Sequence, residues 1–462
     1  MINKIIYFPI EVKKREFDSR CYQALKLINE GFKVSICTKS SINHYRHKMK
    51  PGLVYFKSSG PRYHNLMKEF KKFGHQNILL DEEGLFFNDE SLYSKRFSKK
   101  NFKYIDYIFT WGKRDFLAIK KMSKYSKIFN IGSPRIDLLT QKTNKRYFTE
   151  SDKIKKKYGK FILLNTQLIF INHYTHQNQG SFIKNVGDKK KDYKYDKKQL
   201  FLAEQTVLIQ KKIFSDYKDF LEVFSKECPN YKLIVRPHPA ENHEIWKKII
   251  KKYDNVIYIH DDRSASSWML ASQFSIASNC TTTIESFLLN KFSINYRPIK
   301  NLKVEFELPI ICGLNIDNIK NLIEFVKKNY KKSNLKINYI NKKNTKILNE
   351  RFSNLNGYCS VKKLSEILVS NINFNSNNYS LNGKTINLNL FEKLKNVLRI
   401  IYLDIKLKVF KNKASLFSIQ KVPGMTEKEI FERIVLFKRL LRIKINFSVN
   451  QEEPGMFIIK KN

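Results

Sequence analysis

Residues 4–38, KIIYFPIEVKKREFDSRCYQALKLINEGFKVSICT, carry the pattern that decides the fold. A run of β-branched and aromatic residues, Lys4–Ile10, precedes a stretch of helical spacing, Cys21–Gly31, and a second apolar run, Lys33–Thr38. Strand, helix and strand in this order form one βα unit of a parallel sheet. The polar residues between Ile10 and Cys21 are expected to form the loop that follows the first strand.

The same alternation of short apolar runs and helical stretches continues to about residue 330. Further strands are expected at 53–57, 77–80, 104–110, 127–131, 160–164, 232–236, 256–260, 274–277 and 293–296, and helices at 202–224, 281–289 and 316–328. We therefore expect an α/β fold of the GT-B-like kind, with two doubly wound parallel-sheet domains facing a cleft and a helical C-terminal extension.

Changes in composition along the chain suggest four segments. Residues 1–135 form the first Rossmann-like domain, which ends at the punctuation Gly132-Ser-Pro-Arg135, and residues 136–335 form the second. Residues 336–385, rich in Asn, Lys and Ser, are linker-like. Residues 386–462 are expected to form a basic helical tail, with helices at 390–410 and 426–445.

The last of these helices is amphipathic. Six apolar residues fall roughly on one face, namely Ile430, Ile434, Phe437, Leu440, Leu441 and Ile443, while Lys428, Arg433, Lys438 and Arg439 add positive charge. Such a helix could lie on an anionic membrane surface, or it could pack its apolar stripe on the body of the protein. We favour packing, and keep the membrane as an alternative partner. A Lys-rich stretch at 184–198 is expected to be a solvated loop, with contact to phosphates or lipid as the alternative.

The chain of 462 residues carries 87 Lys and Arg against 42 Asp and Glu, a formal net charge of +45. This excess favours acidic partners such as a phosphate-bearing substrate, an anionic membrane or nucleic acid. Compositional bias, with many Lys, Asn, Ile, Phe and Tyr, explains the charge equally well. No signature of a nucleic-acid-binding module accompanies the charge, so no nucleic acid is expected as a partner.

Several other classes are excluded by missing motifs. The sequence has no GxGxxG, GxxxxGK[ST] or HExxH pattern, which removes the dinucleotide-binding, P-loop and zinc-protease readings. Six cysteines are scattered without the spacing of a zinc site or a disulfide framework. The N-terminus lacks the build of a signal peptide, and no apolar run is long enough to span a membrane. We expect a cytoplasmic protein, with peripheral association with the cytoplasmic membrane as an option.

The loop after the first strand holds several cations. In an open α/β sheet this loop opens into the crevice where ligands bind. Lys13, Lys14, Arg15 and Arg20 could therefore hold an anionic ligand in the cleft. The alternative is a charged start of the next helix, with Asp18 or Ser19 as its N-cap.

An apolar run ends abruptly in Asp81-Glu82-Glu83-Gly84. Adjacent carboxylates oppose one another's ionisation, so at least one of them should titrate upward, as a general base near neutral pH requires. Gly84 would let the turn aim them into the cleft. Ordinary turn formation is the alternative.

A second candidate site combines two strand ends of the second domain. The strand at 232–236 runs into Arg236-Pro-His238-Pro239, which fixes an imidazole between two rigid residues beside a cation. The strand at 274–277 runs into a polar turn at the start of a helix, where hydroxyls and backbone N–H groups can bind phosphate. Its candidate donor-binding residues are Ser278, Asn279, Thr281, Thr282, Thr283 and Glu285. A capping box of Thr282 and Glu285 is the alternative. His173 could face the cleft, and no metal site is expected.

These motifs resemble a known set. Bacterial sialyltransferases and polysialyltransferases have a D/E-D/E-G motif, an HP motif and a Ser/Thr motif in this order on a GT-B fold, and capsule Kdo transferases and CDP-glycerol glycerophosphotransferases have related HP sites. Residues 4–330, with EVKKREFDSR, GSPR and RPHP, also look like the surface carbohydrate biosynthesis protein group.

The resemblance implies a metal-independent glycosyltransferase with no cofactor other than its nucleotide-sugar donor. The donor would be a CMP-linked acidic sugar such as sialic acid or Kdo, and the acceptor a glycan or glycolipid of a surface polysaccharide, capsule or lipopolysaccharide. In this pattern the first domain binds the acceptor and the second the nucleotide sugar. Glu83 or Glu82 would be the base, and His238 would act on the donor phosphate. A CDP-glycerol or polyol-phosphate transferase, a UDP-sugar 2-epimerase and a non-catalytic basic binding module remain alternatives.

Overall fold

The computed structural model describes residues 4–82, 84, 93–94, 96–140, 142–174, 197–261, 263–332, 334–355, 357, 359–372, 422 and 424–462. The chain divides into two compact units. Unit 1 comprises residues 1–143 and 347–462, and unit 2 comprises residues 144–346. Glu83, most of the Lys-rich stretch at 184–198 and the expected helix at 390–410 lie outside the described residues.

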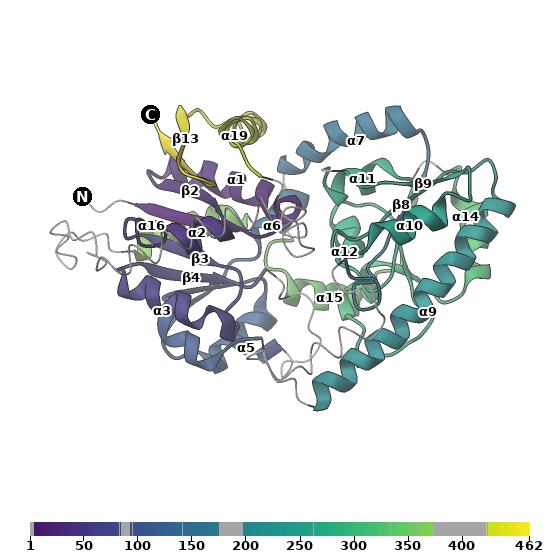
Figure 1. Ribbon diagram of the computed structural model, residues 1–462, viewed down its shortest axis with the longest axis horizontal. Coiled ribbons are helices and arrows are strands. Elements are labelled where there is room, and N and C mark those ends of the chain that lie inside the picture. Colours follow the sequence, from purple (N-terminus) through teal and green to yellow (C-terminus); the bar gives the residue numbers. More distant parts are fainter. Residues whose placement is uncertain are drawn as a thin grey trace, which may run out of the picture. The chain divides into compact units, whose positions relative to one another are not determined.

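Unit 1 is built on a mixed sheet (Figure 1). Its described strands are β1 (Ile5–Ile10), β2 (Lys33–Thr38), β3 (Leu53–Phe56), β4 (Gln76–Leu80), β5 (Tyr107–Thr110), β6 (Lys127–Asn130), β13 (Phe447–Glu453) and β14 (Met456–Lys461). They lie in the order β13-β14-β2-β1-β3-β4-β5-β6, and β1 to β6 are all parallel. The chain order reverses between β1 and β3, the position where ligands bind in sheets of this kind.

Helices and short 3-10 turns connect and cover these strands. The described helices of unit 1 are α1 (Lys13–Asn29), α2 (Lys39–Tyr45), α3 (His64–Lys72), α5 (Lys113–Met122), α6 (Pro134–Thr140), α16 (Ser360–Asn371) and α19 (Glu427–Leu441), with 3-10 turns η1 (Pro61–Tyr63) and η3 (Lys99–Tyr104). The first expected helix begins earlier than its apolar spacing indicated, at Lys13 rather than Cys21. Its N-cap is Val12, so the alternative N-caps Asp18 and Ser19 are both wrong.

The end of the chain completes the sheet of unit 1. Strands β13 and β14 form an antiparallel hairpin, and β14 pairs antiparallel with β2 through Met456–Ile459 (Figure 1). The expected helical tail 386–462 therefore ends in two strands. Strand β13 lies at the edge of the sheet, and its polar residues 450–452 are exposed.

Helix α19 packs on the body of unit 1. Of its apolar stripe, Ile430, Ile434 and Phe437 are fully buried, whereas Leu440, Leu441 and Ile443 are half-buried. Phe437 contacts Tyr22 of α1 with ring centroids 5.7 Å apart. Arg433 pairs with Asp18 and lies over the Phe17 ring. The amphipathic stripe thus serves protein packing, which was the favoured interpretation.

The segment after residue 346 packs against α6 of unit 1 through buried hydrogen bonds. Asn354, fully buried, donates to Asp137 Oδ1 at 2.6 Å and to the carbonyl of Ser133 at 2.9 Å. Asp137 in turn accepts from the backbone N–H groups of Ser360 and Val361 at the start of α16. The linker-like interpretation of 336–385 thus covers α15 (Lys342–Arg351) and α16, which are ordered by buried polar contacts that no local pattern shows.

Unit 2 is a second parallel sheet with helices. Its described strands, in sheet order, are β12 (Leu314–Ile316), β11 (Ser293–Tyr296), β10 (Ser275–Ala277), β7 (Ile162–Asn165), β8 (Leu233–Arg236) and β9 (Val256–Tyr258). Its described helices are α7 (Lys145–Tyr158), α9 (Lys197–Glu227), α10 (His243–Ile250), α11 (Ala265–Ala271), α12 (Thr281–Leu288), α13 (Glu307–Cys312) and α14 (Ile319–Asn329), and η4 (Lys142–Asn144) precedes α7. The chain order reverses between β7 and β10.

The α/β fold class expected from the sequence is confirmed. Both units have doubly wound sheets; that of unit 2 is parallel, and that of unit 1 is parallel from β1 to β6 with an antiparallel edge of β13 and β14. The division at Thr143 lies after the expected boundary at Arg135, because α6 and its Asp137 belong to unit 1. The second division, after Lys346, falls inside α15. No helix within the described ranges is both long and apolar enough to cross a membrane.

Candidate active site

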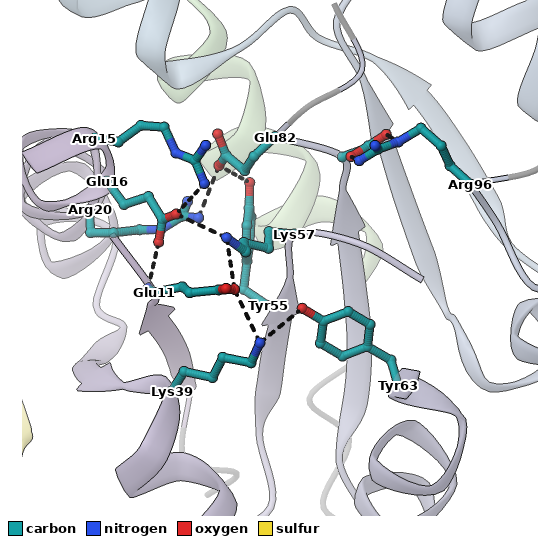
Figure 2. A network of polar contacts seen from close by, with 11 residues as sticks. Glu11, Arg15, Glu16, Arg20, Lys39, Tyr55, Lys57, Tyr63, Glu82 and Arg96 are labelled. Atoms are coloured by element: carbon teal, nitrogen blue, oxygen red, sulfur yellow. Dashed lines mark hydrogen bonds and ion pairs between the residues drawn. The ribbon is translucent and has the colours of Figure 1, made fainter. Parts of the chain in front are cut away.

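The carboxyl edge of the unit 1 sheet gathers charged side chains. Glu11, Lys39, Lys57 and Asp81 each directly follow a strand, namely β1, β2, β3 and β4. Figure 2 shows Glu11 and Lys57 meeting Glu16 of α1, with Lys39 beside Glu11. Because this edge includes the β1/β3 reversal, these charges lie where an open α/β sheet binds its ligands.

Lys57 is the centre of one half of this cluster. Its Nζ lies 2.9 Å from Glu11 and 3.2 Å from Glu16, a carboxylate that is 1% exposed (Figure 2). Glu16 also accepts from the backbone N–H of Glu11 and from Arg15. Burial opposes ionisation of Glu11, but the charges of Lys57 and Lys39 outweigh it and lower its pKa to about 2. Glu11 is therefore ionised at neutral pH and paired with Lys57 and Lys39.

The other half is a buried ion pair. Arg20, fully buried, donates from Nη2 to Glu82 Oε1 at 2.9 Å, and Tyr55 donates to the same oxygen at 3.3 Å. The guanidinium lies over the rings of Tyr55 and Phe8, 4.1 and 5.3 Å from their centroids. Among the described residues, Arg20 Nε and Nη1 and Glu82 Oε2 have no hydrogen-bond partner. Glu82 is thus oriented through one oxygen only.

Asp81 is held differently from Glu82. Arg96 binds its carboxylate with two hydrogen bonds of 2.9 Å, and Trp111 donates to its carbonyl oxygen at 2.7 Å. Each of these two adjacent carboxylates therefore has its own arginine, Arg96 for Asp81 and Arg20 for Glu82. Burial raises the pKa of another carboxyl that packs against this turn, Asp115. Glu83, the favoured base, lies outside the described residues.

A pocket lies beside this cluster. It is lined by Pro9, Glu11, Lys39, Ile42, Asn43, Val54, Tyr55, Phe56, Lys57, Tyr63, Leu66 and Phe70. With its open mouth it encloses about 420 Å³. Apolar side chains form most of its wall, while Glu11, Lys39 and Lys57 supply charged groups at the strand ends, the usual composition of a small-molecule site.

The four cations expected in the first loop lie in different places in the structure. Since residues 13–20 belong to α1, they are not a loop. Arg15 and Arg20 join the cluster, whereas Lys13 donates to Glu429 and to the carbonyl of Gly424, both at 2.6 Å, and so ties α1 to the C-terminal part of unit 1. Lys14 lies half-buried in the first turn of α1.

The carboxyl edge of unit 2 carries the Arg-Pro-His-Pro turn. The Nδ1 atom of His238 accepts from the backbone N–H of Ala240 at 3.1 Å, so in the neutral ring Nε2 carries the proton. Pro239 lies inside this turn and restricts it. Arg236 ends β8, and burial lowers the pKa of its guanidinium while the charges of Asp261 and Glu285 oppose that shift. In the neutral ring the proton of His238 is therefore on Nε2, and Arg236 at the start of the same turn is a partly desolvated cation.

A carboxylate that sequence reasoning missed holds this turn. Glu241 is fully buried and accepts from Thr166 Oγ1 at 2.7 Å and from Trp246 Nε1 at 2.9 Å. It also accepts from the backbone N–H of His238 and of Leu168, each at 3.2 Å. Burial raises the pKa of Glu241, and these donors counteract the rise. His173 forms an isolated antiparallel bridge with Glu241, which places the predicted cleft histidine beside this turn.

Ser278 and Asn279 follow β10 and make contacts within the protein. Ser278 donates to the carbonyl of Tyr296 and is bonded to Tyr217 Oη at 3.2 Å. Asn279 adopts φ 47°, its side chain accepts from the backbone N–H of Phe306 at 2.7 Å, and its own backbone N–H donates to Asn295 Oδ1 at 3.0 Å. Both side chains therefore shape the turn.

The start of α12 is not capped by its threonines. The N-cap is Cys280, which makes no side-chain cap bond, so the capping box of Thr282 and Glu285 is wrong. Thr283, fully buried, and Asn165, at the end of the neighbouring β7, have side-chain polar atoms without a hydrogen-bond partner among the described residues. Asn165 lies in register with Arg236 of β8. Buried polar groups normally have partners, so these atoms mark a place for a ligand or water.

Thr281 begins α12 next to this turn, and Glu285 lies one turn further along. Glu285 is close enough to raise the pKa of Arg236, which links the Ser/Thr turn to the Arg-Pro-His-Pro turn. In the part of the chain that the structure describes, no three His, Cys, Asp or Glu side chains are grouped to hold a metal ion.

Several site residues could have been found from strand ends alone. Glu11, Lys39 and Lys57 directly follow apolar runs, and the rule that ligands bind at carboxyl ends of parallel strands applies to them as it does to Asp81. Glu241 lies three residues after His238 in the sequence. Asp115 and Arg351 gave no such signal, because they meet only through the tertiary fold.

No protein-family model matches the chain, and no curated protein sequence matches it. Solved structures with a similar arrangement include the wall teichoic acid polymerase TagF, at 12% identity and a TM-score of 0.45 over 80% of this chain and 89% of that one. The UDP-GlcNAc 2-epimerase of Methanocaldococcus jannaschii, in complex with UDP-GlcNAc and UDP, has 12% identity and a TM-score of 0.46 over 79% and 99%. MnaA of S. aureus with UDP has 13% identity and a TM-score of 0.44 over 80% and 96%.

Identities of 11–13% and TM-scores below 0.5 do not transfer a substrate or a reaction to this chain.

Proposed function

We propose that this protein is a nucleotide-sugar-dependent glycosyltransferase. In the proposal, unit 2 binds the nucleotide phosphate of the donor and unit 1 binds the acceptor and supplies the base. The observation that carries it is the meeting of three strand ends at the β7/β10 reversal of unit 2. Asn165, the Arg236–Pro239 turn and the start of α12 lie together there, with buried polar atoms of Asn165 and Thr283 left without protein partners among the described residues.

Phosphate suits this edge chemically. The first turn of α12 offers backbone N–H groups and the positive end of a helix dipole. His238 can donate from Nε2, since Nδ1 is engaged with Ala240. Arg236 adds a cation whose charge is poorly solvated and therefore gains most from an anionic partner. Together these groups would compensate the negative charge of the leaving phosphate.

In the proposed reaction the acceptor hydroxyl oxygen attacks the anomeric carbon of the donor sugar. The bond between this carbon and the phosphate oxygen breaks, and the nucleotide leaves with the electron pair. Its oxygen is stabilised by His238 and Arg236, and the hydroxyl proton passes to a carboxylate of the Glu82–Glu83 pair. Arg20 and Tyr55 both bind Oε1 of Glu82, which leaves the second oxygen as the acceptor of that proton.

The pocket next to Glu11, Lys39 and Lys57 is the proposed acceptor site. It combines aromatic walls from Phe56 and Tyr63 with charged groups that can bond sugar hydroxyls or acid groups. We propose that the donor is a CMP-activated acidic sugar and that the acceptor is a surface glycan or glycolipid.

Nucleotide release by the purified protein tests the proposal. CMP-sialic acid, CMP-Kdo, CDP-glycerol and UDP-GlcNAc are each supplied with and without a glycan acceptor. We expect CMP to be released from a CMP-sugar, with release stimulated by the acceptor. Release of CMP from CDP-glycerol alone would replace the proposal with polyol-phosphate transfer, and isomerisation of UDP-GlcNAc without an acceptor would replace it with epimerisation.

Two substitutions assign the roles. His238→Ala and Glu83→Gln are each expected to reduce turnover at least 100-fold while the thermal unfolding curve is unchanged. Glu244→Gln, an exposed residue of the same α10 region, is the matched control. A His238→Ala variant that keeps full turnover would remove His238 from the reaction and would favour a binding protein over an enzyme.

An anionic membrane is a further proposed partner. Lys438, Arg439, Arg442 and Lys444 line a shallow hollow at the end of α19 together with Val435 and Ile443, with no carboxylate among the lining residues. Because β13 and β14 belong to the unit 1 sheet, truncation before α19 would damage the fold, so substitution is the better test. Arg439→Gln, Arg442→Gln and Lys444→Gln together should reduce sedimentation with anionic vesicles but not with neutral ones. Unchanged sedimentation would contradict this partner.

A further inference from the structure

A buried carboxyl that the proposed reaction does not use lies directly behind the acidic turn. Asp115, in the first turn of α5, is 3% exposed. Its Oδ2 atom has no hydrogen-bond partner among the described residues and would lie 3.6 Å from a Cβ placed on Gly84. Asp115 therefore packs against the turn that carries Asp81 and Glu82.

The charged and titratable groups around Asp115 come from four parts of unit 1. Asp81 lies at the end of β4 with its partner Arg96, Tyr93 packs beside Gly84, and Arg114 is the neighbour of Asp115 in α5. Arg351, at the end of α15, completes the set. Burial is the main cause that raises the pKa of Asp115, to about 7, with Asp81 adding to the rise and Arg351 and Arg114 opposing it.

Arg351 reaches this place because its segment is docked with close backbone contacts. It is 2% exposed, and its Nη2 lies 3.4 Å from the carbonyl oxygen of Gly84. A Cβ at Gly112 would lie 2.4 Å from the carbonyl oxygen of Glu350, so only glycine allows this approach. Ser353 donates its N–H to Trp111, whose indole donates to Asp81. The segment after residue 346 and the acidic turn are thus one packed assembly.

We infer that Asp115 is a proton-holding positioning residue of the Asp81–Gly84 turn, and that Arg351 from the C-terminal part of the chain sets its charge. When Asp115 is ionised, Arg351 compensates it across the Gly84 carbonyl. When Asp115 is protonated, its repulsion with Asp81 disappears, and Asp81 keeps its two hydrogen bonds from Arg96. The positioning role in catalysis rests on the proposed function. The titration of Asp115 and its coupling to Arg351 do not.

The test is a ¹³C NMR titration of the full chain labelled with [4-¹³C]aspartate, from pH 5 to pH 9. We expect a carboxyl resonance with a midpoint near 7 that is absent from Asp115→Asn. This variant separates it from Asp137, whose pKa is raised by burial to about 6. The inference would be overturned if the wild type shows no resonance that titrates near pH 7 and disappears in Asp115→Asn.

Variants of the neighbours test the coupling in both directions. Arg351→Met should move the midpoint up by about one pH unit, and Asp81→Asn should move it down by about one. Arg351→Lys keeps the charge and should leave the midpoint near that of the wild type, as should Arg46→Met, which removes a surface pair with Glu69. If Arg351→Met does not fold, Arg351→Lys and Asp81→Asn decide the question. A midpoint that Asp81→Asn does not lower contradicts the coupling.

Turnover supplies a separate readout. The acidic limb of the kcat profile should shift in the same direction as the NMR midpoint in each variant, whereas a merely structural residue would lower kcat at every pH alike. If no nucleotide sugar is turned over, the proposed function fails, while the NMR titration still decides the role of Asp115. If turnover occurs with an acidic limb that ignores Arg351, the positioning role is wrong.

Discussion

The polar groups at the carboxyl edges of the two sheets are held in place by different kinds of contact. In unit 1, charged groups at the strand ends compensate one another, as in the pairs Arg20–Glu82, Arg96–Asp81 and Lys57–Glu11. In unit 2, the turn at His238 is held through its backbone by Glu241, while Asn165 and Thr283 have buried polar atoms without a described protein partner. The unit 1 edge is thus held by ion pairs between charged side chains, whereas the unit 2 turn is held by one buried carboxylate, Glu241, through backbone and side-chain donors.

This contrast separates positioning from binding. Salt-bridged side chains such as Glu82 and Asp81 are fixed before any ligand arrives, which suits a group that must accept a proton in a defined direction. Unsatisfied donors beside a helix N-terminus gain most when a phosphate replaces water. The largest mutational effects on stability are therefore expected where charges are buried, and the largest effects on ligand affinity at unit 2.

The largest expected effect on stability is at Glu241. Glu241→Ala would strand the indole of Trp246, the hydroxyl of Thr166 and the N–H of His238, and should lower the free energy of unfolding of unit 2 by about 5 kcal/mol. Urea unfolding followed by tryptophan fluorescence measures this. The control Glu244→Ala, which breaks an exposed pair with Lys247, should change little. Equal stability of the two variants would show that Glu241 does not hold the turn.

A somewhat smaller loss is expected from breaking the buried pair of unit 1. Arg20→Met leaves Glu82 as an uncompensated buried charge and should lower the free energy of unfolding by about 3 kcal/mol. The double variant Arg20→Met/Glu82→Gln should recover part of that loss, because no charge is then stranded. Arg46→Met, at a partly exposed pair, is the matched control. A double variant as unstable as Arg20→Met would deny that the pair acts as a unit.

Acid should weaken the unit 1 cluster through Glu11. Its pKa is lowered from 4.5 to about 2 in the folded state, so its stabilising contribution is present above pH 4.5 and is lost as the pH falls through about 2. Glu11→Gln should therefore cost about 1 kcal/mol at pH 7, after allowance for solvent screening, and nothing near pH 2. Thermal unfolding between pH 2 and 7 measures the gap. A gap that stays constant over this range would contradict the assignment.

The smallest effect is expected at Lys13. It binds Glu429 and the carbonyl of Gly424 instead of joining the cluster, so Lys13→Gln should lower the free energy of unfolding by less than about 1 kcal/mol. Acceptor binding, measured by calorimetry with the glycan used for turnover, should not change. Loss of acceptor affinity would place Lys13 in the site after all.

The fold could be predicted further than the site. Apolar runs such as 4–10, 33–38 and 293–296 marked strands to within a residue, because a buried parallel strand needs continuous β-branched or aromatic residues. The start of α1 was missed because its first two turns are polar on the surface yet bury Glu16 and Arg20, which only their ion pairs permit. No sequence window shows a partner 62 residues away.

The sequence also did not predict that residues 347–462 belong to unit 1. Strand β14 pairs with β2, and Asn354 bonds Asp137, through contacts that span hundreds of residues. The motif residues Asp81, Glu82, Arg236 and His238 were placed correctly at strand ends, since the rule for parallel sheets is local. Glu241, Asp115 and Arg351 required the tertiary packing.

Calorimetric titration of CMP, CDP and UDP tests most directly whether the unit 2 edge binds a nucleotide phosphate. Wild type is compared with His238→Ala, with Thr283→Val, which keeps the shape of the buried side chain, and with Glu244→Gln as the control. We predict that a cytidine nucleotide binds the wild type and the control alike and binds His238→Ala and Thr283→Val at least 10-fold more weakly. Equal affinity for all four proteins, or no binding of any nucleotide, would contradict the account.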